Sequence, residues 1–169
     1  DNLAIGYQAM TTNTAGGVTN VAIGNYSLDA LTSGDGNVGV GMETLSATNT
    51  GRYNTAVGYR TLYTNTSGDT NVAVGKESLY YNTTGDDNIA LGNQALTSNT
   101  TGASNTAIGT NALTANTTAD DNVAIGHNTL SANTTGTRNI GIGRGAYYGS
   151  DTENDNLAIG YNAMTTNTA

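Results

Sequence analysis

A pentad of the form Asn-x-Ala-x-Gly recurs ten times along the chain at an almost constant step. The sequence numbers of successive pentads differ by 18 once and by 17 eight times, and the third position is Ala except at Gly39 and Gly141. A fixed short period predicts a stacked-repeat protein, in which each unit buries its apolar face only against its neighbours. The pentads begin at Asn2, Asn20, Asn37, Asn54, Asn71, Asn88, Asn105, Asn122, Asn139 and Asn156.

The composition favours a thin, elongated core. The chain of 169 residues has no Phe, Trp, Pro or Cys, and Asn, Thr and Gly fill most of each repeat. Such a sequence is too poor in large apolar residues for a layered globule and too periodic for disorder. A repeat this short cannot hold a pair of helices, and its Gly, Asn and Thr are poor helix formers, so we expect an all-β protein.

Each repeat, numbered from its Asn as position 1, reads as strand, turn, strand, turn. Apolar or Thr residues at positions 2 and 4 predict a short strand, and Gly at position 5 ends it because backbone angles or tight contacts exclude a side chain. We place a second strand around apolar position 9, facing positions 2 and 4, before an Asn-Thr-Thr-Gly turn. Position 3 then points the other way, toward a second chain or the opposite wall of a thin coil.

The predicted fold is a parallel β-solenoid, or β-roll, of about ten 17-residue coils with two short strands in each. Equivalent residues of coils about 4.8 Å apart would stack into ladders. The asparagines at position 1 would form an amide ladder, with a plain turn role as the alternative. This structural ladder comprises Asn20, Asn37, Asn54, Asn71, Asn88, Asn105, Asn122 and Asn139, and the turn glycines are Gly24, Gly41, Gly58, Gly75, Gly92, Gly109, Gly126 and Gly143.

A second, longer period lies above the short one. Residues 155–169 repeat residues 1–15 with a single change, from Gln8 to Asn162, so equivalent positions of the longer period are offset by 154 in the numbering. We therefore interpret residues 1–169 as a single β-solenoid segment of a longer repeat array. Such a segment is compatible with an end-to-end filament.

Charged residues gather at positions 16 and 17 of the repeat. Stacked carboxylates would repel one another, and two arginines fall where they relieve the repulsion. We predict two axial ion-pair sandwiches, Asp35–Arg52–Asp69 and Asp121–Arg138–Asp155. With 13 acidic and 5 basic residues the chain has no basic stripe, so we expect no nucleic-acid partner.

No arrangement of residues indicates catalysis. His127 and Lys76 are the single histidine and lysine, and both occupy the variable position 6. No serine is spaced to pair with a base, and neither a glycine-rich phosphate loop nor a calcium-binding nonapeptide is present. We predict no enzymatic activity, no cofactor and no metal site. No apolar run approaches the roughly 20 residues that span a bilayer, so we expect no membrane insertion.

Several polar ladders are candidate binding or modification sites. Tyr63 and Tyr80, at position 10 of adjacent coils, should stack and could contact sugars. Sequons at position 12 would place glycans along one ridge, the alternative being that Asn-Thr-Thr only forms a turn. Ranks of Thr at positions 13 and 14, as at Thr100, Thr117 and Thr134, raise ice binding as a further candidate. The possible glycosylation sites are Asn65, Asn82, Asn99, Asn116 and Asn133.

The pentads resemble repeats of known fibrous proteins. NVAIG at 20–24 and 122–126 resembles the head repeats of trimeric autotransporter adhesins, which form left-handed parallel β-rolls. The phrase NTAVGYRTLYTNTSGDTNVAVG at 54–75 is similar to repeats of phage tail-fibre-like and bacterial surface proteins that end in a self-cleaving intramolecular chaperone domain. The resemblance implies a left-handed roll in an extracellular or virion fibre, often trimeric with its Ala faces against partner chains.

We therefore expect a structural role. The leading hypothesis is an extracellular fibre or filament shaft, secreted or carried by a cell surface or virion, whose partner is itself as a homo-oligomer, a trimer or an end-to-end filament. The alternative is an adhesin or tail-fibre shaft that binds cell-surface glycans. An ice-binding solenoid is the weaker third hypothesis.

Overall fold

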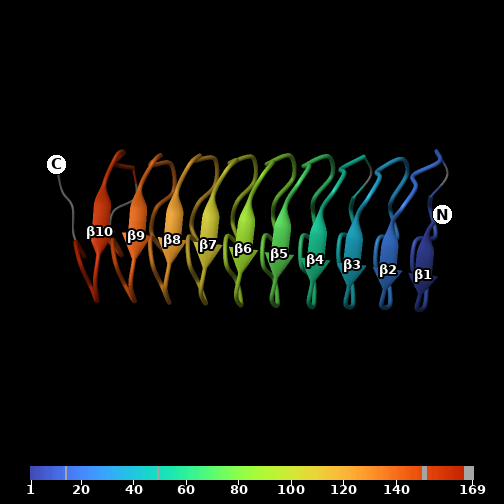
Figure 1. Cartoon of the computed structure of the whole chain (residues 1–169), viewed down its shortest axis with the longest axis horizontal. Coiled ribbons are helices and arrows are strands. Elements are labelled where there is room, and N and C mark those ends of the chain that lie inside the picture. The colour runs from blue at the N-terminus through green and yellow to red at the C-terminus, as the bar shows by residue number, and fades with distance from the viewer. Residues whose placement is uncertain (14, 49, 150–151, 166–169) are drawn as a thin grey trace.

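The protein is a rod built on one parallel sheet (Figure 1). The computed structural model describes residues 1–13, 15–48, 50–149 and 152–165. Ten strands pair in chain order, and the described residues contain no helix, which confirms an all-β solenoid. The strands are β1 (Leu3–Ile5), β2 (Val21–Ile23), β3 (Val38–Val40), β4 (Thr55–Val57), β5 (Val72–Val74), β6 (Ile89–Leu91), β7 (Thr106–Ile108), β8 (Val123–Ile125), β9 (Ile140–Ile142) and β10 (Leu157–Ile159).

Every strand occupies positions 2 to 4 of its repeat and pairs with the same positions of the next repeat. In the pair β5–β6, Val72 lies beside Ile89 and Ala73 lies beside Ala90. Because the paired positions are equivalent throughout the sheet, like residues stack upon like residues. The stacking that the 17-residue period predicts is therefore confirmed.

Each coil of the described structure contains one strand, whereas two were predicted. Around position 9 the chain turns twice, because Glu77 (φ 55°) and Leu79 (φ 50°) both have left-handed backbone conformations. Backbone bonding between coils nevertheless continues there: the Leu79 N–H donates to the Ala95 carbonyl at 3.0 Å. Residues with such angles cannot extend into a strand, and Leu adopts them so rarely that the sequence gives no warning.

Position 9 packs on the position-3 side of the sheet, whereas it was predicted to face positions 2 and 4. Ala73 and Ala90 at position 3 are fully buried, whereas Val72 and Val74 at positions 2 and 4 are 36% and 39% exposed. Leu79 at position 9 is also fully buried and packs in the same core cluster as the alanines. Of the two alternatives for position 3, the opposite wall of a thin coil is therefore confirmed, and the buried Ala faces do not contact partner chains as the resemblance implied.

Candidate functional site

A column of asparagine side chains at position 1 links each coil to the next. Asn88 donates from its backbone N–H and its Nδ2 to Oδ1 of Asn71, at 3.0 and 3.1 Å. Its Nδ2 also donates to the Gly102 carbonyl at 2.9 Å, and its Oδ1 accepts from the Asn105 backbone N–H at 3.0 Å. The predicted ladder residues lie in this column, and each is only 0–1% exposed to solvent: Asn20, Asn37, Asn54, Asn71, Asn88, Asn105, Asn122 and Asn139.

A second asparagine column lies at position 12, which holds the possible glycosylation sites. Asn99 donates from Nδ2 to Oδ1 of Asn82 at 2.9 Å and to the Gly102 carbonyl at 2.8 Å. A buried amide with both hydrogens engaged is not accessible to a glycosyltransferase in the folded coil. Each of these asparagines is 0% exposed, which favours the alternative that Asn-Thr-Thr only forms a turn: Asn65, Asn82, Asn99, Asn116 and Asn133.

Glycine at position 5 lies where the backbones of adjacent coils come closest. Gly92 has φ 137°, and a Cβ on it would lie 2.6 Å from both the carbonyl carbon and the carbonyl oxygen of Gly109. An unfavourable backbone angle and a tight contact therefore exclude a side chain together. The predicted turn glycines share φ values between 122° and 138°: Gly24, Gly41, Gly58, Gly75, Gly92, Gly109, Gly126 and Gly143.

Aspartates at position 16 accept hydrogen bonds from the backbone of the preceding coil. Oδ1 of Asp69 accepts from the Arg52 N–H, and Oδ1 of Asp86 accepts from the Asp69 N–H, both at 2.7 Å. Within the described part of the chain, Arg52 forms no ion pair, so the predicted sandwich with Asp35 and Asp69 is wrong. The prediction counted only charges and overlooked the backbone donors that satisfy these carboxylates.

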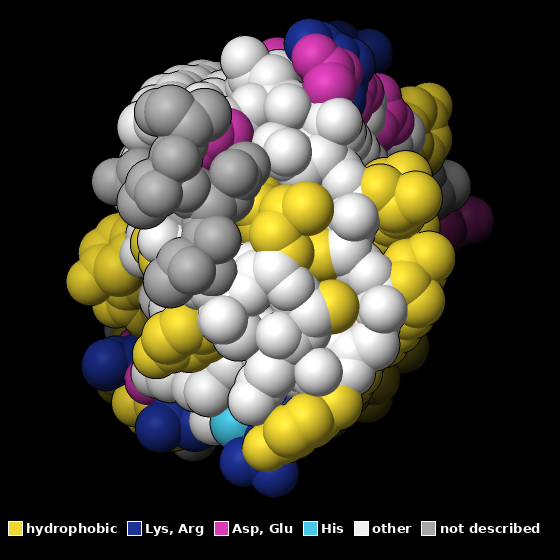
Figure 2. All heavy atoms as spheres, turned by 90° about the vertical axis from the view of Figure 1, so that its left-hand side faces the viewer, with side chains coloured by type: hydrophobic (Ala, Val, Ile, Leu, Met, Phe, Trp, Pro, Cys, Tyr) yellow, Lys and Arg dark blue, Asp and Glu magenta, His cyan; other side chains and the backbone are white. Residues whose placement is uncertain are grey.

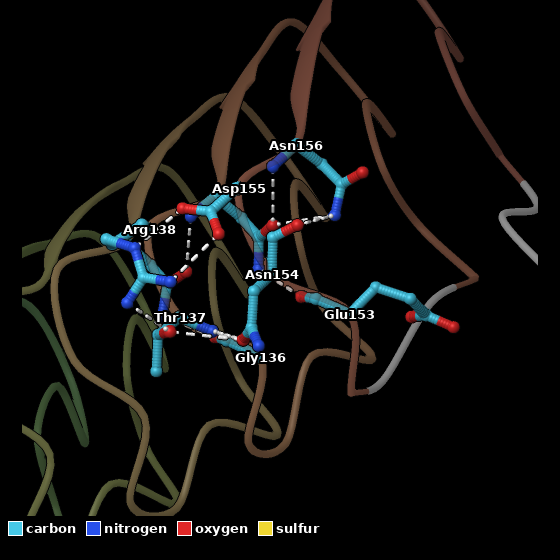
Figure 3. A network of polar contacts seen from close by, with 9 residues as sticks. Gly136, Thr137, Arg138, Glu153, Asn154, Asp155 and Asn156 are labelled. Carbon is cyan, nitrogen blue, oxygen red and sulfur yellow. Dashed lines mark hydrogen bonds and ion pairs between the residues drawn. The ribbon is translucent and has the colours of Figure 1, made fainter. Parts of the chain in front are cut away.

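Arg138 forms a forked ion pair with one neighbouring coil (Figure 3). Its Nε and Nη2 donate to Oδ1 and Oδ2 of Asp155 at 2.6 and 2.8 Å. Among the described residues the ion pair with Asp121 that would complete the sandwich is not formed. The hydrogen bond from Arg138 lowers the pKa of Asp155 below 3.8. The same hydrogen bond raises the pKa of Arg138, and the charge of Asp121 contributes less to that rise.

This pairing predicts a pH-dependent contribution to stability. Because the pKa of Asp155 is lower in the folded state, the ion pair stabilises the fold above the ordinary carboxyl pKa, and the contribution disappears as the pH falls through the lowered value. In an NMR titration of the Asp155 carboxyl carbon, we expect the pKa to rise toward 3.8 in Arg138→Gln. Arg52→Gln should leave this titration unchanged. An identical titration curve in Arg138→Gln would contradict the assignment.

Side chains at positions 6, 7 and 10 form a polar and aromatic edge. Tyr63 and Tyr80 stack as predicted, with ring centroids 5.1 Å apart and planes 13° apart. Arg60 Nε lies 2.6 Å from Glu43 Oε2, and the Arg60 guanidinium lies 5.7 Å from the centre of the Tyr63 ring. This ion pair was not predicted, although opposite charges at position 7 of adjacent repeats indicate it.

The outer face of the sheet is a largely apolar, uncharged surface. Its twenty side chains at positions 2 and 4 are Val, Ile, Leu or Thr, without a charge, and eleven of them are at least 36% exposed. Figure 2 looks along the rod from its C-terminal end and shows hydrophobic side chains gathered along the right-hand flank. We call these twenty residues the outer strand face.

The threonine ranks are partly occupied by bonds within the rod. Thr100 Oγ1 donates to the Thr117 carbonyl at 2.9 Å, and Thr117 Oγ1 donates to the Thr134 carbonyl at 3.2 Å. A hydroxyl hydrogen engaged in this way is not available to an ice lattice. In these ranks the exposed threonines are those at position 14, such as Thr101 and Thr118.

Within the described ranges, no group of three or more His, Asp or Glu side chains is arranged to hold a metal ion. Nor does that part of the chain contain a helix with the length and apolar character needed to cross a bilayer. No protein-family model, curated protein or solved structure matches this chain.

Proposed function

We propose that the chain is a structural segment of an extracellular fibre and that it associates side by side with further copies of itself. The observation that supports this proposal is the outer strand face. Soluble monomers rarely expose a continuous apolar patch larger than a few hundred Å². Ten strands at sheet spacing extend this surface over roughly 43 Å, so solvent exposure along its whole length would be costly.

A second copy of the same chain fits this surface better than an unrelated partner. The face repeats its chemistry at every coil, because Val, Ile, Leu or Thr returns at each strand. A partner that contacts every row must carry apolar side chains at the same axial spacing of about 4.8 Å. A parallel or antiparallel copy meets this requirement automatically, and interfaces between identical chains are the commonest in oligomers.

Lysine on the outer strand face is expected to separate the copies without unfolding the rod. Val74 and Ile108 are 39% and 36% exposed on β5 and β7, so each can become Lys while its coil stays intact. Burying two unpaired ammonium groups between copies would be strongly unfavourable. We expect Val74→Lys with Ile108→Lys to convert an oligomer to a monomer in sedimentation equilibrium, with the circular dichroism spectrum unchanged.

The matched control is Thr84→Lys with Thr118→Lys, which adds the same charge at the same spacing on an exposed ridge outside the outer strand face. This control should remain oligomeric. If the wild-type chain sediments as a monomer at high concentration, lateral self-association is refuted. The same measurement gives the number of chains in the cross-section of the oligomer.

A further inference from the structure

We propose that Tyr63 and Tyr80 are the site of an oxidative cross-link, a carbon–carbon bond between their rings that ties two adjacent coils together. The rings come from the coils of β4 and β5, with centroids 5.1 Å apart and planes 13° apart. Reacting groups held this close behave as parts of one molecule, so dilution of the protein does not slow their reaction. The proposal is independent of any association between copies of the chain.

Tyrosine is the residue type through which this chain is able to form covalent cross-links. Tyr occurs ten times, whereas Phe, Trp and Cys are absent and Lys76 is the single lysine. A chain without cysteine forms no disulfide, and a single lysine gives lysine-based links one site at most. A tyrosine phenol that loses one electron and one proton becomes a radical, and two such radicals couple through their rings.

Tyr81 exposes the pair to an oxidant in solution. This residue is 51% exposed, and its ring contacts the Tyr80 ring edge to face, with centroids 4.6 Å apart. Tyr63 and Tyr80 are themselves less exposed. A radical formed on Tyr81 therefore reaches Tyr80 through a direct ring contact, by transfer of one electron and one proton.

The oxidant in this proposal is hydrogen peroxide, acting through a haem peroxidase. Each of the two phenols gives up one electron and one proton. The O–O bond of the peroxide breaks and takes up both electrons and both protons, which yields two water molecules. The two radicals join through one Cε carbon of each ring, and the hydrogens of these carbons leave as protons while the phenolic oxygens are protonated again. One C–C bond therefore replaces two C–H bonds, and both rings remain aromatic.

The rings have room to form the bond. Tyr63 and Tyr80 are both partly exposed at the surface, so each can turn from face-to-face stacking to edge-to-edge contact. Their backbones are already held together, because the Thr64 N–H donates to the Tyr80 carbonyl at 3.1 Å. The bond closes a loop of about one coil and restricts the unfolded chain, so the cross-linked rod should unfold at a higher denaturant concentration.

Peptide mapping after oxidation tests the proposal on the complete chain. The dilute protein is treated with hydrogen peroxide and a peroxidase, then unfolded and digested with trypsin. Trypsin cleaves after every Arg and Lys, so Tyr63 falls in peptide 61–76 and Tyr80 in peptide 77–138. We expect a joined species with the summed mass of these two peptides less two hydrogen atoms.

Two comparisons show that the joined species comes from one chain and from this pair. A bond between Tyr7 and Tyr26, whose rings also touch, would stay inside peptide 1–52 and cannot give this species. When isotope-labelled and unlabelled protein are oxidised together, the two peptides of each joined species should be both labelled or both unlabelled.

The matched control for ring contact is peptide 53–60. Its two tyrosines, Tyr53 and Tyr59, are 62% and 37% exposed. Within the described ranges neither ring contacts another tyrosine ring. Peptide 53–60 should therefore join other peptides at least about tenfold less often than 61–76 joins 77–138.

Substitution by Phe keeps a ring at each position and removes the phenol. Tyr63→Phe and Tyr80→Phe should each abolish the joined species while the circular dichroism spectrum stays unchanged. Tyr81→Phe should still form it, although more slowly, because the bond does not include Tyr81. The proposal is overturned if oxidation of the wild-type chain gives no joined species, if that species combines labelled with unlabelled peptides, if it persists in Tyr80→Phe, if Tyr81→Phe abolishes it, or if peptide 53–60 is joined as readily.

Discussion

Gly92→Ala is expected to lower the free energy of unfolding by about 4 kcal/mol. The backbone of Gly92 has φ 137°, a conformation that costs an L-residue about 1–3 kcal/mol. The added methyl group would also lie 2.6 Å from the Gly109 carbonyl carbon, and overpacking against rigid backbone costs a further 1–3 kcal/mol or so. The coil cannot relax outward, because its neighbours are hydrogen-bonded to it on both sides.

Equilibrium unfolding in denaturant at a fixed protein concentration measures this loss, since association would otherwise shift the apparent stability. Asn93→Ala is the control, because Asn93 is the next residue in the chain and its side chain is exposed. Asn93→Ala should change stability by less than about 0.5 kcal/mol. If Gly92→Ala unfolds at the wild-type midpoint with an unchanged slope, the close approach of the two coils is not a constraint on this position.

Asn88→Ala is expected to destabilise the rod by a similar amount, about 3–5 kcal/mol, for a different reason. The substitution leaves the buried Asn105 backbone N–H without the Oδ1 that accepts it at 3.0 Å. The Asn105 Nδ2 also loses its bond to this Oδ1 at 3.2 Å, but it still donates to the Ala103 and Ala119 carbonyls. It also removes one of the two amide donors to the Gly102 carbonyl, the other being Asn99. Each buried polar group left without a partner costs about 1–3 kcal/mol.

The same unfolding experiment and the same Asn93→Ala control apply to Asn88→Ala. Amide hydrogen exchange gives an independent measurement, because the Asn105 N–H should lose protection while amides several coils away keep it. Destabilisation below about 1 kcal/mol, with the Asn105 amide still protected, would show that the side chains at position 1 contribute little to the stack.

The sequence was sufficient to predict the sheet but not which of its faces is internal. Side chains at positions 2 to 4 alternate between the two faces of the sheet. The usual preference for larger apolar residues in a core indicated that positions 2 and 4 face inward, which is wrong. The coil is thin enough that Leu79 from the opposite wall fills the space, which leaves room only for a methyl group at Ala73. The thickness of the coil depends on the residues with left-handed backbone angles in the segment between one strand and the next. The conformational preferences of Leu do not predict that it adopts such angles.

The buried sequons could have been recognised from the sequence. The recurrence of asparagine in phase at position 1 indicated a ladder, and the same recurrence at position 12, as in Asn82 and Asn99, was interpreted as turn chemistry. In the structure both columns donate to one carbonyl, Gly102 in this coil. The hydrogen bonds that Asp69 and Asp86 accept from backbone N–H groups could not be predicted from the sequence. They depend on the path of the chain between one strand and the next.

Within the described ranges each strand contacts only the strand before it and the strand after it, and the bonds of the position-1 asparagines recur from coil to coil. Removal of residues 88–104 would bring Asn105 onto Asn71 and recreate the contact that was lost. The length of the rod can therefore change by whole 17-residue repeats while the contact at each junction keeps the same form. If the proposed fibre role holds, the number of repeats sets the distance that the fibre spans, at about 4.8 Å for each repeat.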